Sequence, residues 1–198
     1  MSNNLGLVSV YRGTQFSILN PDKKDVNILD IAHSLSNICR FNGHSRFFYS
    51  VAQHCLAVRE MIRKDDLSAM MEMYGLTHDV SEFVCADLQS TFKACINGYR
   101  EIEENIERVF YEAFDLPVPT DEEKAIIKEY DKKALYVEAK NLMVGYRDMN
   151  NITNYGDLDY PITKRDMEEV KEEYFWSFYT LLWEIQQSML IYEEKHTK

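Results

Sequence analysis

The chain has 198 residues, with 22 lysines and arginines against 33 aspartates and glutamates, so its formal net charge is −11. Hydrophobic residues make up 45% of the sequence and charged residues 28%, which is typical of a globular protein and excludes a disordered one. The acidic balance argues against a protein that coats duplex nucleic acid, because such binding depends on lysines and arginines at the phosphates. A small anionic substrate remains compatible with it, since a few local cations or a metal ion can meet the charge of such a molecule.

Membrane association is not expected from the sequence. No stretch approaches the ~20 apolar residues of a membrane-spanning helix, and residues 1–11 lack the basic and apolar regions of a secretory signal. The cysteines are scattered and form no C-x-x-C pair, so we expect reduced thiols packed in helices. Together these observations predict a cytoplasmic protein. The cysteines are Cys39, Cys55, Cys85 and Cys95.

The first part of the chain predicts a β-hairpin. Residues 8–11 and 15–18 are short strand-like segments on either side of Gly13, which is typical of a tight turn. Low contents of glycine and proline, 7 and 4 residues, favour helices over the remainder. Apolar residues at helical spacing predict the first helix over residues 28–37, and we expect the chain to turn again at residues 41–44.

Longer helices are predicted from the middle of the chain onward. We expect one from about Ser50 to Arg63, followed by one that is capped by Asp65 and Asp66 and runs to Phe83. The further helices predicted are one over residues 96–114, one from a capping box at Thr120 to Val144, and a last one capped by Thr163.

The predicted fold is all-α, a compact helical bundle with a short N-terminal β-hairpin. We expect a single domain over residues 1–198, because no repeat or linker marks a boundary. The acidic runs at residues 101–107 and 168–173 contain basic residues and are predicted as solvated helix faces. The parts expected are the hairpin at 1–20, catalytic helices at 21–145, a loop at 145–161 and a C-terminal helix at 162–195.

Four ionisable residues are predicted on helices where packing alone would not place them. They are His54, the adjacent His78 and Asp79, and Asp131. Burying such groups costs several kcal/mol each unless they are compensated. A divalent metal ion held by two imidazoles and two carboxylates would compensate all four at once. Because a single histidine such as His54 is more often a hydrogen-bonded core residue, the metal prediction depends on the four occurring together.

Glu82 follows His78 by four residues and Asp79 by three, which places it on the same helical face one turn further on. A carboxylate there is suited to take the proton of a water that the metal activates. The alternative is a solvated helical glutamate. Asp87 is expected just past the end of this helix, where it also fits a simple turn residue.

In their spacing these residues resemble the HD-domain metal-dependent phosphohydrolases. The resemblance is carried by residues 50–54, by the run from His78 to Glu82, by Asp87 and by Asp131, and it spans roughly residues 16–142. A single His-Asp pair would be weak, whereas several spaced elements in order are specific. The branch that the chain resembles most contains bacterial 5′-deoxynucleotidases and small phage dATP triphosphohydrolases.

From the resemblance follow the roles of the metal ligands. It makes His54, His78, Asp79 and Asp131 the ligands of a divalent transition metal, which would be Mn, Co, Fe, Ni or Zn. It makes Glu82 the residue that activates or orients the attacking water. The expected fold is then that of a compact HD-domain helical bundle.

Substrate contacts are implied in the same way. Arg40 matches the phosphate-binding arginine of the family, and Phe41 stands where relatives often carry a tryptophan against the sugar or base. Lys93 and Arg46 would add positive charge, although the loop before Lys93 lacks the prolines that are usual in relatives. Asp87 would steer the nucleotide or hold a second ion, such as Mg, on the phosphates.

Two reactions fit this set of residues. The resemblance favours hydrolysis of a deoxynucleoside triphosphate, dATP above the others, with release of deoxynucleoside and triphosphate. The alternative is a 5′-deoxynucleotidase that acts on deoxynucleoside monophosphates. In either case electrostatic stabilisation of the reacting phosphate supplies most of the catalysis.

Non-catalytic functions stay open as a different class. A small acidic protein can mimic DNA and block a nuclease, but here lysines and arginines interrupt the acidic helices. A metal-binding module that binds a nucleotide without turnover is a further alternative. As partners we expect a small deoxynucleotide, no duplex nucleic acid and no membrane. The apolar C-terminal helix predicts a homo-oligomer, a dimer or larger, in the host cytoplasm if a phage encodes the chain.

Overall fold

Two short strands open the described part of the chain. β1 (Leu7–Ser9) and β2 (Gln15–Ser17) pair antiparallel, and Gly13 takes a left-handed φ of 81° in the turn between them, as the sequence predicted. The buried ring of Phe16 packs edge-on against Phe83, with 5.0 Å between the ring centroids. This contact attaches the hairpin to the helical body.

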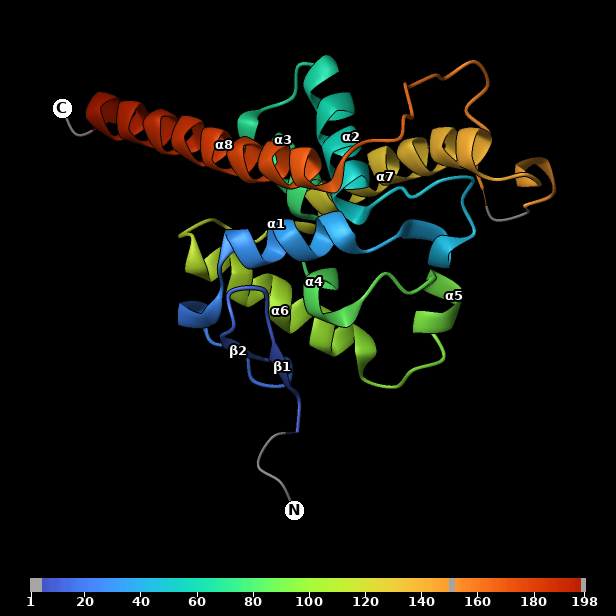
Figure 1. Cartoon of the computed structure of the whole chain (residues 1–198). Helices are drawn as coiled ribbons and strands as arrows, with labels where there is room; N and C mark the ends of the chain where they lie inside the picture. Colours follow the sequence, from blue (N-terminus) through green and yellow to red (C-terminus); the bar gives the residue numbers. More distant parts are fainter. Residues whose placement is uncertain (1–4, 150–151, 197–198) are drawn as a thin grey trace.

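A computed structural model describes residues 5–149 and 152–196, and within them the protein is mostly helical, which confirms the all-α prediction (Figure 1). The central helix α2 contacts four others and is buried on nearly all sides, which explains its run of apolar residues. Ser50 and Gln53 form a capping box at its start. The central helix is α2 (Val51–Lys64), and the helices around it are α1 (Ile28–Asn37), α3 (Ala69–Thr77), α7 (Asp121–Leu142) and α8 (Met167–His196).

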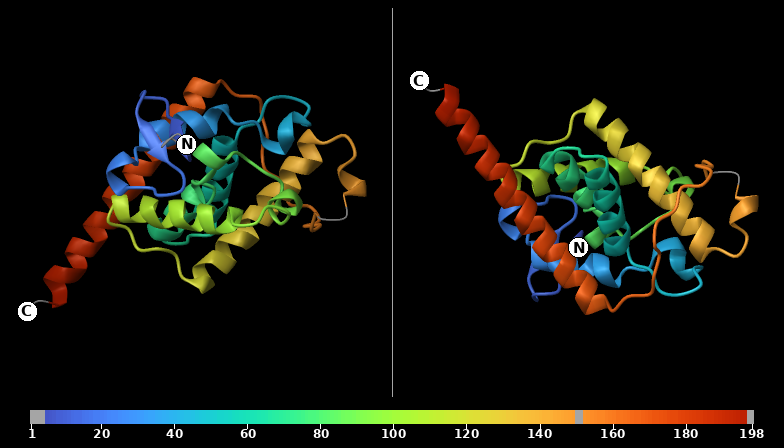
Figure 2. Two further views of the ribbon diagram at one scale, coloured as in Figure 1. Left: turned by 90° about the horizontal axis from the view of Figure 1, so that it is seen from below. Right: turned by 90° about the horizontal axis from the view of Figure 1, so that it is seen from above.

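A second group of elements lies below this layer in Figure 1. α6 (Tyr99–Ala113) and α7 approach each other on one side of α2 (Figure 2). The capping box predicted at Thr120 is present, since its side chain accepts from the backbone of Glu123 and Glu123 reaches back. The short elements are α4 (Glu82–Cys85), α5 (Ser90–Lys93), and the 3₁₀ turns η1 (Lys23–Asp25), η2 (Arg40–Gly43) and η3 (Tyr146–Asp148).

The helix predicted to run from Asp65 to Phe83 was wrong in two ways. Its cap is Ser68, whose hydroxyl accepts from the backbone of Met71, because Asp66 takes a left-handed φ of 54° and closes the turn after α2. The helix then ends at Thr77, and the chain turns before α4 begins. This turn carries two of the predicted metal ligands, so the break serves to position them.

The cap predicted for the last helix was also wrong. α8 is capped by Asp166, whose carboxylate accepts from the backbone N–H groups of Glu168 and Glu169. Thr163 lies before the helix, and its carbonyl oxygen accepts instead from the side chain of Gln53. The C-terminal half of α8 extends past the rest of the molecule in the views of Figures 1 and 2.

The cysteines are all free, but only Cys55 and Cys85 lie in helices, whereas Cys39 and the exposed Cys95 lie outside them. Among the described residues, no helix combines the length and the apolar character that crossing a membrane requires.

Candidate metal centre

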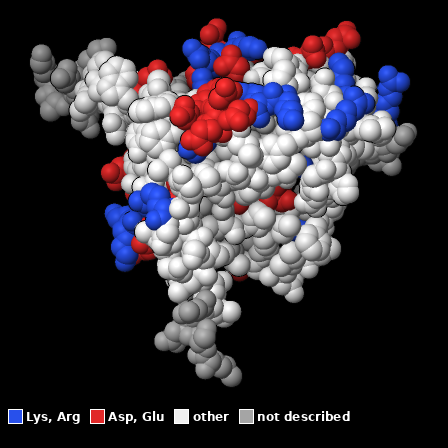
Figure 3. All heavy atoms as spheres, viewed as in Figure 1, with Lys and Arg blue, Asp and Glu red and all other residues white. Residues whose placement is uncertain are grey.

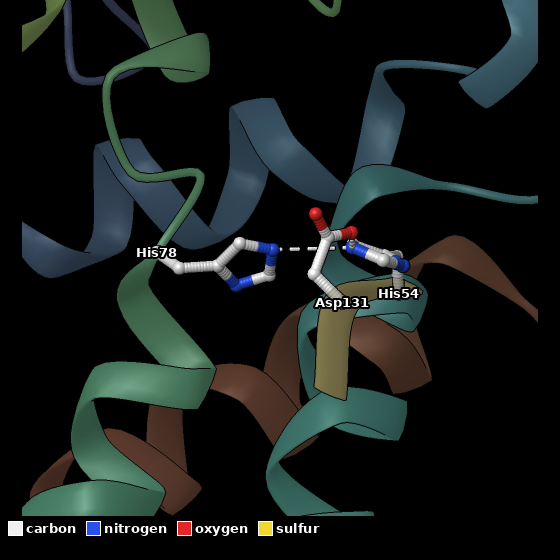
Figure 4. A group of neighbouring side chains, drawn as sticks. All are labelled: His54, His78 and Asp131. Carbon is white, nitrogen blue, oxygen red and sulfur yellow. Dashed lines mark hydrogen bonds and ion pairs between the residues drawn. The ribbon is translucent and has the colours of Figure 1, made fainter. Parts of the chain in front are cut away.

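Three segments that are distant in the sequence bring the predicted ligands together. His54 comes from the first turn of α2 and is fully buried, His78 and Asp79 come from the turn after α3, and Asp131 comes from the middle of α7. Figure 4 shows the rings of His54 and His78 facing each other, with the carboxylate of Asp131 beside them. The sequence prediction that these residues converge is therefore met by the fold.

The facing atoms lie close to one another. Nε2 of His54 is 3.1 Å from Nε2 of His78 and 3.2 Å from Oδ1 of Asp131. Oδ2 of Asp79 lies 3.2 Å from Nε2 of His78 and 3.6 Å from Nε2 of His54. The ligand atoms of His54, His78 and Asp131 all lie within 4.8 Å of one another and could hold one ion, and Asp79 lies beside the two histidines.

The second nitrogen of each ring fixes which form the imidazole takes. Nδ1 of His78 lies 2.8 Å from the carbonyl oxygen of Gly75, which only accepts, so this nitrogen carries the hydrogen. Nδ1 of His54 lies 2.7 Å from the carboxylate of Glu138 and donates to it. A neutral ring of either residue then turns a lone pair of Nε2 toward the other. These lone pairs and the carboxylate of Asp131 lie close enough together to hold a cation, with Asp79 beside them, and the group has the ligand types of a divalent transition metal.

Electrostatics of the group agree with this geometry. Burial and Arg40 lower the pKa of His54, but Glu138 and Asp131 outweigh them and raise it to about 10. Burial raises the pKa of Asp79, yet the two histidines outweigh it and hold that pKa well below its ordinary value. The same balance, chiefly with His54, lowers the pKa of Asp131. The site therefore attracts positive charge, which a proton or a metal ion can supply.

Glu138 is a part of the site that the sequence analysis missed. It is fully buried on α7 and accepts from Nδ1 of His54 and, at 3.1 Å, from Nε of Arg40. Burial raises its pKa, but Arg40 and His54 outweigh burial and lower it. Glu138 follows Asp131 by seven residues, two helical turns on the same face, and this spacing was the signal available in the sequence.

Arg40 and Phe41 meet the centre from the side of η2. Nη1 of Arg40 lies 3.7 Å from Asp79, and the guanidinium stands over the ring of Phe41 at 5.6 Å from its centroid. Phe41 takes a left-handed φ of 56°, a conformation that is costly for a residue with a side chain and that concentrates at binding sites. The pair is thus held rigidly next to the ligands.

Glu82 stands at the start of α4 and is buried, with 3% of the residue exposed. One oxygen, Oε1, accepts from Nζ of Lys93 at 3.0 Å, while Oε2 finds no partner among the described residues. Burial, Asp79 and Asp87 raise the pKa of Glu82 well above its usual value, against the opposing effect of Lys93. A buried carboxylate oxygen without a donor is costly and indicates a missing partner such as water or substrate.

The remaining predicted contacts are divided. Lys93 lies in α5 and also donates to Glu103 at 2.7 Å, so it belongs to the centre. Asp87 is half-buried, and burial raises its pKa while Arg40 lowers it. Arg46 differs from both, because it is exposed and its backbone N–H donates to the carbonyl of Leu142. The structure does not bring its side chain into the group.

Open space adjoins the centre on two sides. Acidic atoms are visible in a recess near the middle of the face in Figure 3, between α1 and the segment that joins α4 to α5. On another side, a cavity of about 280 Å³ lies between α6 and α7. Glu103, Glu104 and Glu107 line it, and on the face predicted as solvated over residues 101–107 the glutamates Glu103 and Glu107 are half-buried, whereas Glu101 and Glu104 are exposed. Cys55 contributes a thiol close to His78 and Asp79 as well.

Comparison with known proteins gives relatives but no activity. No family model matches the chain. The "Uncharacterized protein YfdR" of Escherichia coli (strain K12) is 35% identical over 113 residues, which cover 57% of this chain and 61% of that protein, less than two thirds of its length. The "Uncharacterized protein RCAP_rcc00048" of Rhodobacter capsulatus is 31% identical over 162 residues, 78% of this chain and 81% of that protein.

Proposed function

We propose that the chain, which belongs to the same family as the Rhodobacter capsulatus protein RCAP_rcc00048, is a divalent-metal-dependent hydrolase of deoxynucleotides of the HD-domain type. One observation carries the proposal: Nε2 of His54, Nε2 of His78 and a carboxylate oxygen of Asp131 lie within 4.8 Å of one another, with the carboxylate of Asp79 beside both histidines. Such a group is expensive to bury without a cation. The resemblance of its spacing to the HD-domain phosphohydrolases supplies the reaction class.

His54, His78, Asp79 and Asp131 hold the ion, and Glu138 orients the His54 ring through Nδ1. Their mixture of imidazole and carboxylate suits Mn, Co, Fe, Ni or Zn. When bound, such an ion lowers the pKa of water and polarises a phosphoryl oxygen.

Glu82 takes the proton of the attacking water. Its Oε2 has no hydrogen-bond partner within residues 5–149 and 152–196, and Lys93 on Oε1 holds the carboxylate in place. The raised pKa of Glu82 makes it a stronger base than an ordinary glutamate once it is ionised. Asp87, whose pKa is also raised, steers the nucleotide or a second cation on the phosphates.

Arg40 balances the charge that develops on the phosphate in the transition state. Glu138 accepts from its Nε at 3.1 Å and Asp79 lies at the longer distance of 3.7 Å from Nη1, so the terminal nitrogens can still bind an anion. Phe41 offers its ring to the sugar or base. Because the guanidinium is already paired and stacked, it loses little freedom when it binds the phosphate.

A deoxynucleoside triphosphate, dATP above the others, is the substrate that the resemblance favours, and a deoxynucleoside monophosphate is the alternative. The non-catalytic alternatives fit the chain less well. A mimic of DNA presents rows of carboxylates on its surface, whereas on the face in Figure 3 acidic and basic side chains lie next to each other. A module that binds without turnover would not need the unpaired oxygen of Glu82.

The proposal is tested by incubating the purified protein with each deoxynucleoside mono- and triphosphate and with Mn²⁺, Co²⁺, Ni²⁺, Zn²⁺, Fe²⁺ or Mg²⁺. We expect hydrolysis that a chelator abolishes and that is lost in the Asp131→Asn variant, while the exposed Glu122→Gln variant on the same helix behaves like the parent protein. Separation of phosphate from triphosphate identifies the bond that breaks. A protein that leaves every deoxynucleotide intact with every metal contradicts the proposed function.

The role of Glu82 makes a prediction about pH. Its carboxylate must be ionised to accept a proton, so kcat/KM should fall as the pH decreases through the raised pKa of this residue. Glu82→Gln should lower kcat by about 10²- to 10⁴-fold and remove this acidic limb of the profile. Glu101→Gln, an exposed position on α6, is the control. An unchanged kcat in the Glu82 variant would refute the role.

A further inference from the structure

The thiol of Cys55 lies beside the metal-ligand group and has no part in the proposed reaction. Cys55 directly follows His54 on α2 and is fully buried. Successive residues of an α-helix are turned by about 100° about its axis, so the two side chains leave α2 in different directions. His54 points to Glu138 and Asp131, whereas Cys55 reaches the turn after α3.

This sulfur forms a second group with two residues of that turn. Sγ of Cys55, a ring nitrogen of His78 and a carboxylate oxygen of Asp79 all lie within 4.8 Å of one another. The ring nitrogen available is Nε2, because Nδ1 of His78 donates its hydrogen to the carbonyl oxygen of Gly75. Within the described residues, Cys55 is the only cysteine that joins such a group. Thiolate, imidazole and carboxylate are the ligand types that zinc takes, often three from the protein with a fourth position for water.

We propose that Cys55, His78 and Asp79 form a second ligand set, the sulfur set, which holds a thiophilic divalent ion such as Cd²⁺ or Zn²⁺. The first set, His54, His78 and Asp131, takes ions that prefer nitrogen and oxygen, such as Mn²⁺. Nε2 of a neutral imidazole has one lone pair and binds one ion, so the two sets cannot be filled together. The inference goes beyond the proposed function for ion binding and rests on it only for the effect on hydrolysis.

Binding to the sulfur set exchanges a proton for the ion. Burial, Asp79 and Glu82 raise the pKa of the Cys55 thiol well above its ordinary value. Arg40 and a hydrogen bond from the backbone of Asp79 oppose this rise without cancelling it, so the thiol stays protonated until an ion arrives. The S–H bond then breaks, a bond from sulfur to the metal forms, and the proton leaves to water. Sulfur keeps both electrons of the broken bond, so no oxidant or reductant takes part.

Packing alone does not explain the surroundings of this thiol. A free cysteine in a core usually behaves as a small apolar residue. Cys55 does belong to the apolar core, which holds the sulfur in place. Its sulfur nevertheless lies next to an imidazole and a carboxylate, two groups that a packing residue does not need and that a soft metal ion binds together with thiolate.

Titration of the purified protein with Cd²⁺ tests the sulfur set directly. Binding of Cd²⁺ should produce the ultraviolet absorption band of charge transfer from thiolate to cadmium. In Cys55→Ser the band should disappear, and Cd²⁺ affinity measured by calorimetry should fall about 100-fold or more, because the loss of a group that only orients a ligand already costs about 10- to 100-fold. Mn²⁺ affinity should change far less, which also shows that the variant is folded. Cys85→Ser removes a half-buried thiol on α4 and, as the matched control, should keep the band and the affinity.

The variant Cys55→Ala, which adds no buried hydroxyl, should reproduce the selective loss of Cd²⁺ binding. A band that persists without Cys55, or a loss of Mn²⁺ and Cd²⁺ binding alike in both Cys55 variants, would overturn the inference.

Competition between the two ions tests their mutual exclusion. Cd²⁺ at a concentration that saturates the parent protein should displace Mn²⁺, and simultaneous binding of both ions would overturn the inference. Cd²⁺ should also inhibit Mn²⁺-supported hydrolysis, with an inhibition constant that rises at least about tenfold in Cys55→Ser. If no deoxynucleotide is hydrolysed, the proposed function fails, while the absorption band and the competition still decide whether the sulfur set exists.

Discussion

α7 and α8 are both long helices, of 22 and 30 residues, and both pack on α3. They differ in where their polar and apolar side chains lie. α7 turns charged groups inward, since Glu138 is fully buried and Asp131 points into the metal-ligand group. α8 turns aromatic groups outward, since Trp176 and Trp183 are 64% and 62% exposed.

Apolar side chains are usually buried and polar side chains exposed, and α7 and α8 depart from this pattern for two different reasons. A buried carboxylate is tolerated only where cations or hydrogen-bond donors meet it, so the interior of α7 indicates a binding centre. An exposed tryptophan has no such local requirement but leaves a large apolar area in water, so the exterior of α8 indicates an association surface. The two helices therefore respond differently to substitution.

Removing the buried charge on α7 should have the largest effect on stability. Glu138→Gln leaves Arg40 without its anion and gives Arg40 and His54 one acceptor oxygen in place of two, so we expect a loss of about 3 kcal/mol in the free energy of unfolding. Metal affinity should fall about 10- to 100-fold, because the orientation of His54 is lost. Denaturant unfolding and metal titration measure the two effects, with the exposed Glu122→Gln as control.

The pH dependence of this loss is also defined. Because the pKa of Glu138 is lowered by Arg40 and His54 in the folded protein, its contribution is present above the unfolded pKa and disappears as the pH falls through the folded one. The gap between parent and variant should therefore close in acid. A constant gap, or none at neutral pH, would mean that the carboxylate is not held by these partners.

Placing a charge on the exterior of α8 should change assembly more than folding. Trp176, Trp183 and Leu190 follow one another at intervals of seven residues and are all exposed, a spacing that suits pairing with another helix. The row is symmetric about Trp183, which fits an antiparallel α8 from a second copy, as a two-fold interface requires. We expect α8 of a second copy to cover it.

Trp183→Glu tests this association. The parent protein should sediment as a dimer or larger assembly and the variant as a smaller species, with the free energy of unfolding of the isolated chain changed by less than about 0.5 kcal/mol. Val144→Glu, an 88% exposed apolar position outside α8, is the control for an added charge. A parent protein that is monomeric at all concentrations rules out the pairing.

Local chemistry explains which features could be predicted from the sequence. The helix at residues 28–37 and the capping box at Thr120 depend on spacing within short segments, and the structure agrees with both. The structure also brings together the four residues predicted as metal ligands, which come from three separate segments. The break after Thr77 was missed because no glycine or proline marks it. There the side-chain hydroxyl of Thr77 donates to the carbonyl of Met73, and the backbone N–H groups of Val80 and Glu82 donate to the carbonyls of Thr77 and Asp79 in the turn.

The burial of α7 and α6 could not be predicted in the same way. Glu138 stands in a run that also contains Lys132, Lys133 and Lys140, and by composition it resembles a solvated glutamate. Only the position of α7 against α2 makes this face internal. Glu107 was missed for the same reason, because an acidic amphipathic helix is normally solvated on that face unless another helix closes a cavity over it.

The smallest expected effect on the free energy of unfolding concerns the buried face of α8. Tyr174 is fully buried, and its hydroxyl makes no hydrogen bond within the described part of the chain, so Tyr174→Phe removes a polar group that folding leaves unsatisfied. We expect the free energy of unfolding to stay equal or to rise by up to about 1 kcal/mol, a shift of ~2–4 °C in Tm. Tyr74→Phe is the matched control, because the hydroxyl of Tyr74 donates to the carbonyl of Pro117 at 3.1 Å and its removal should lower stability by about 1 kcal/mol. If Tyr174→Phe is as destabilising as Tyr74→Phe, the buried face of α8 also holds a polar contact. The buried faces of α7 and α8 would then differ less in polarity than their side chains indicate.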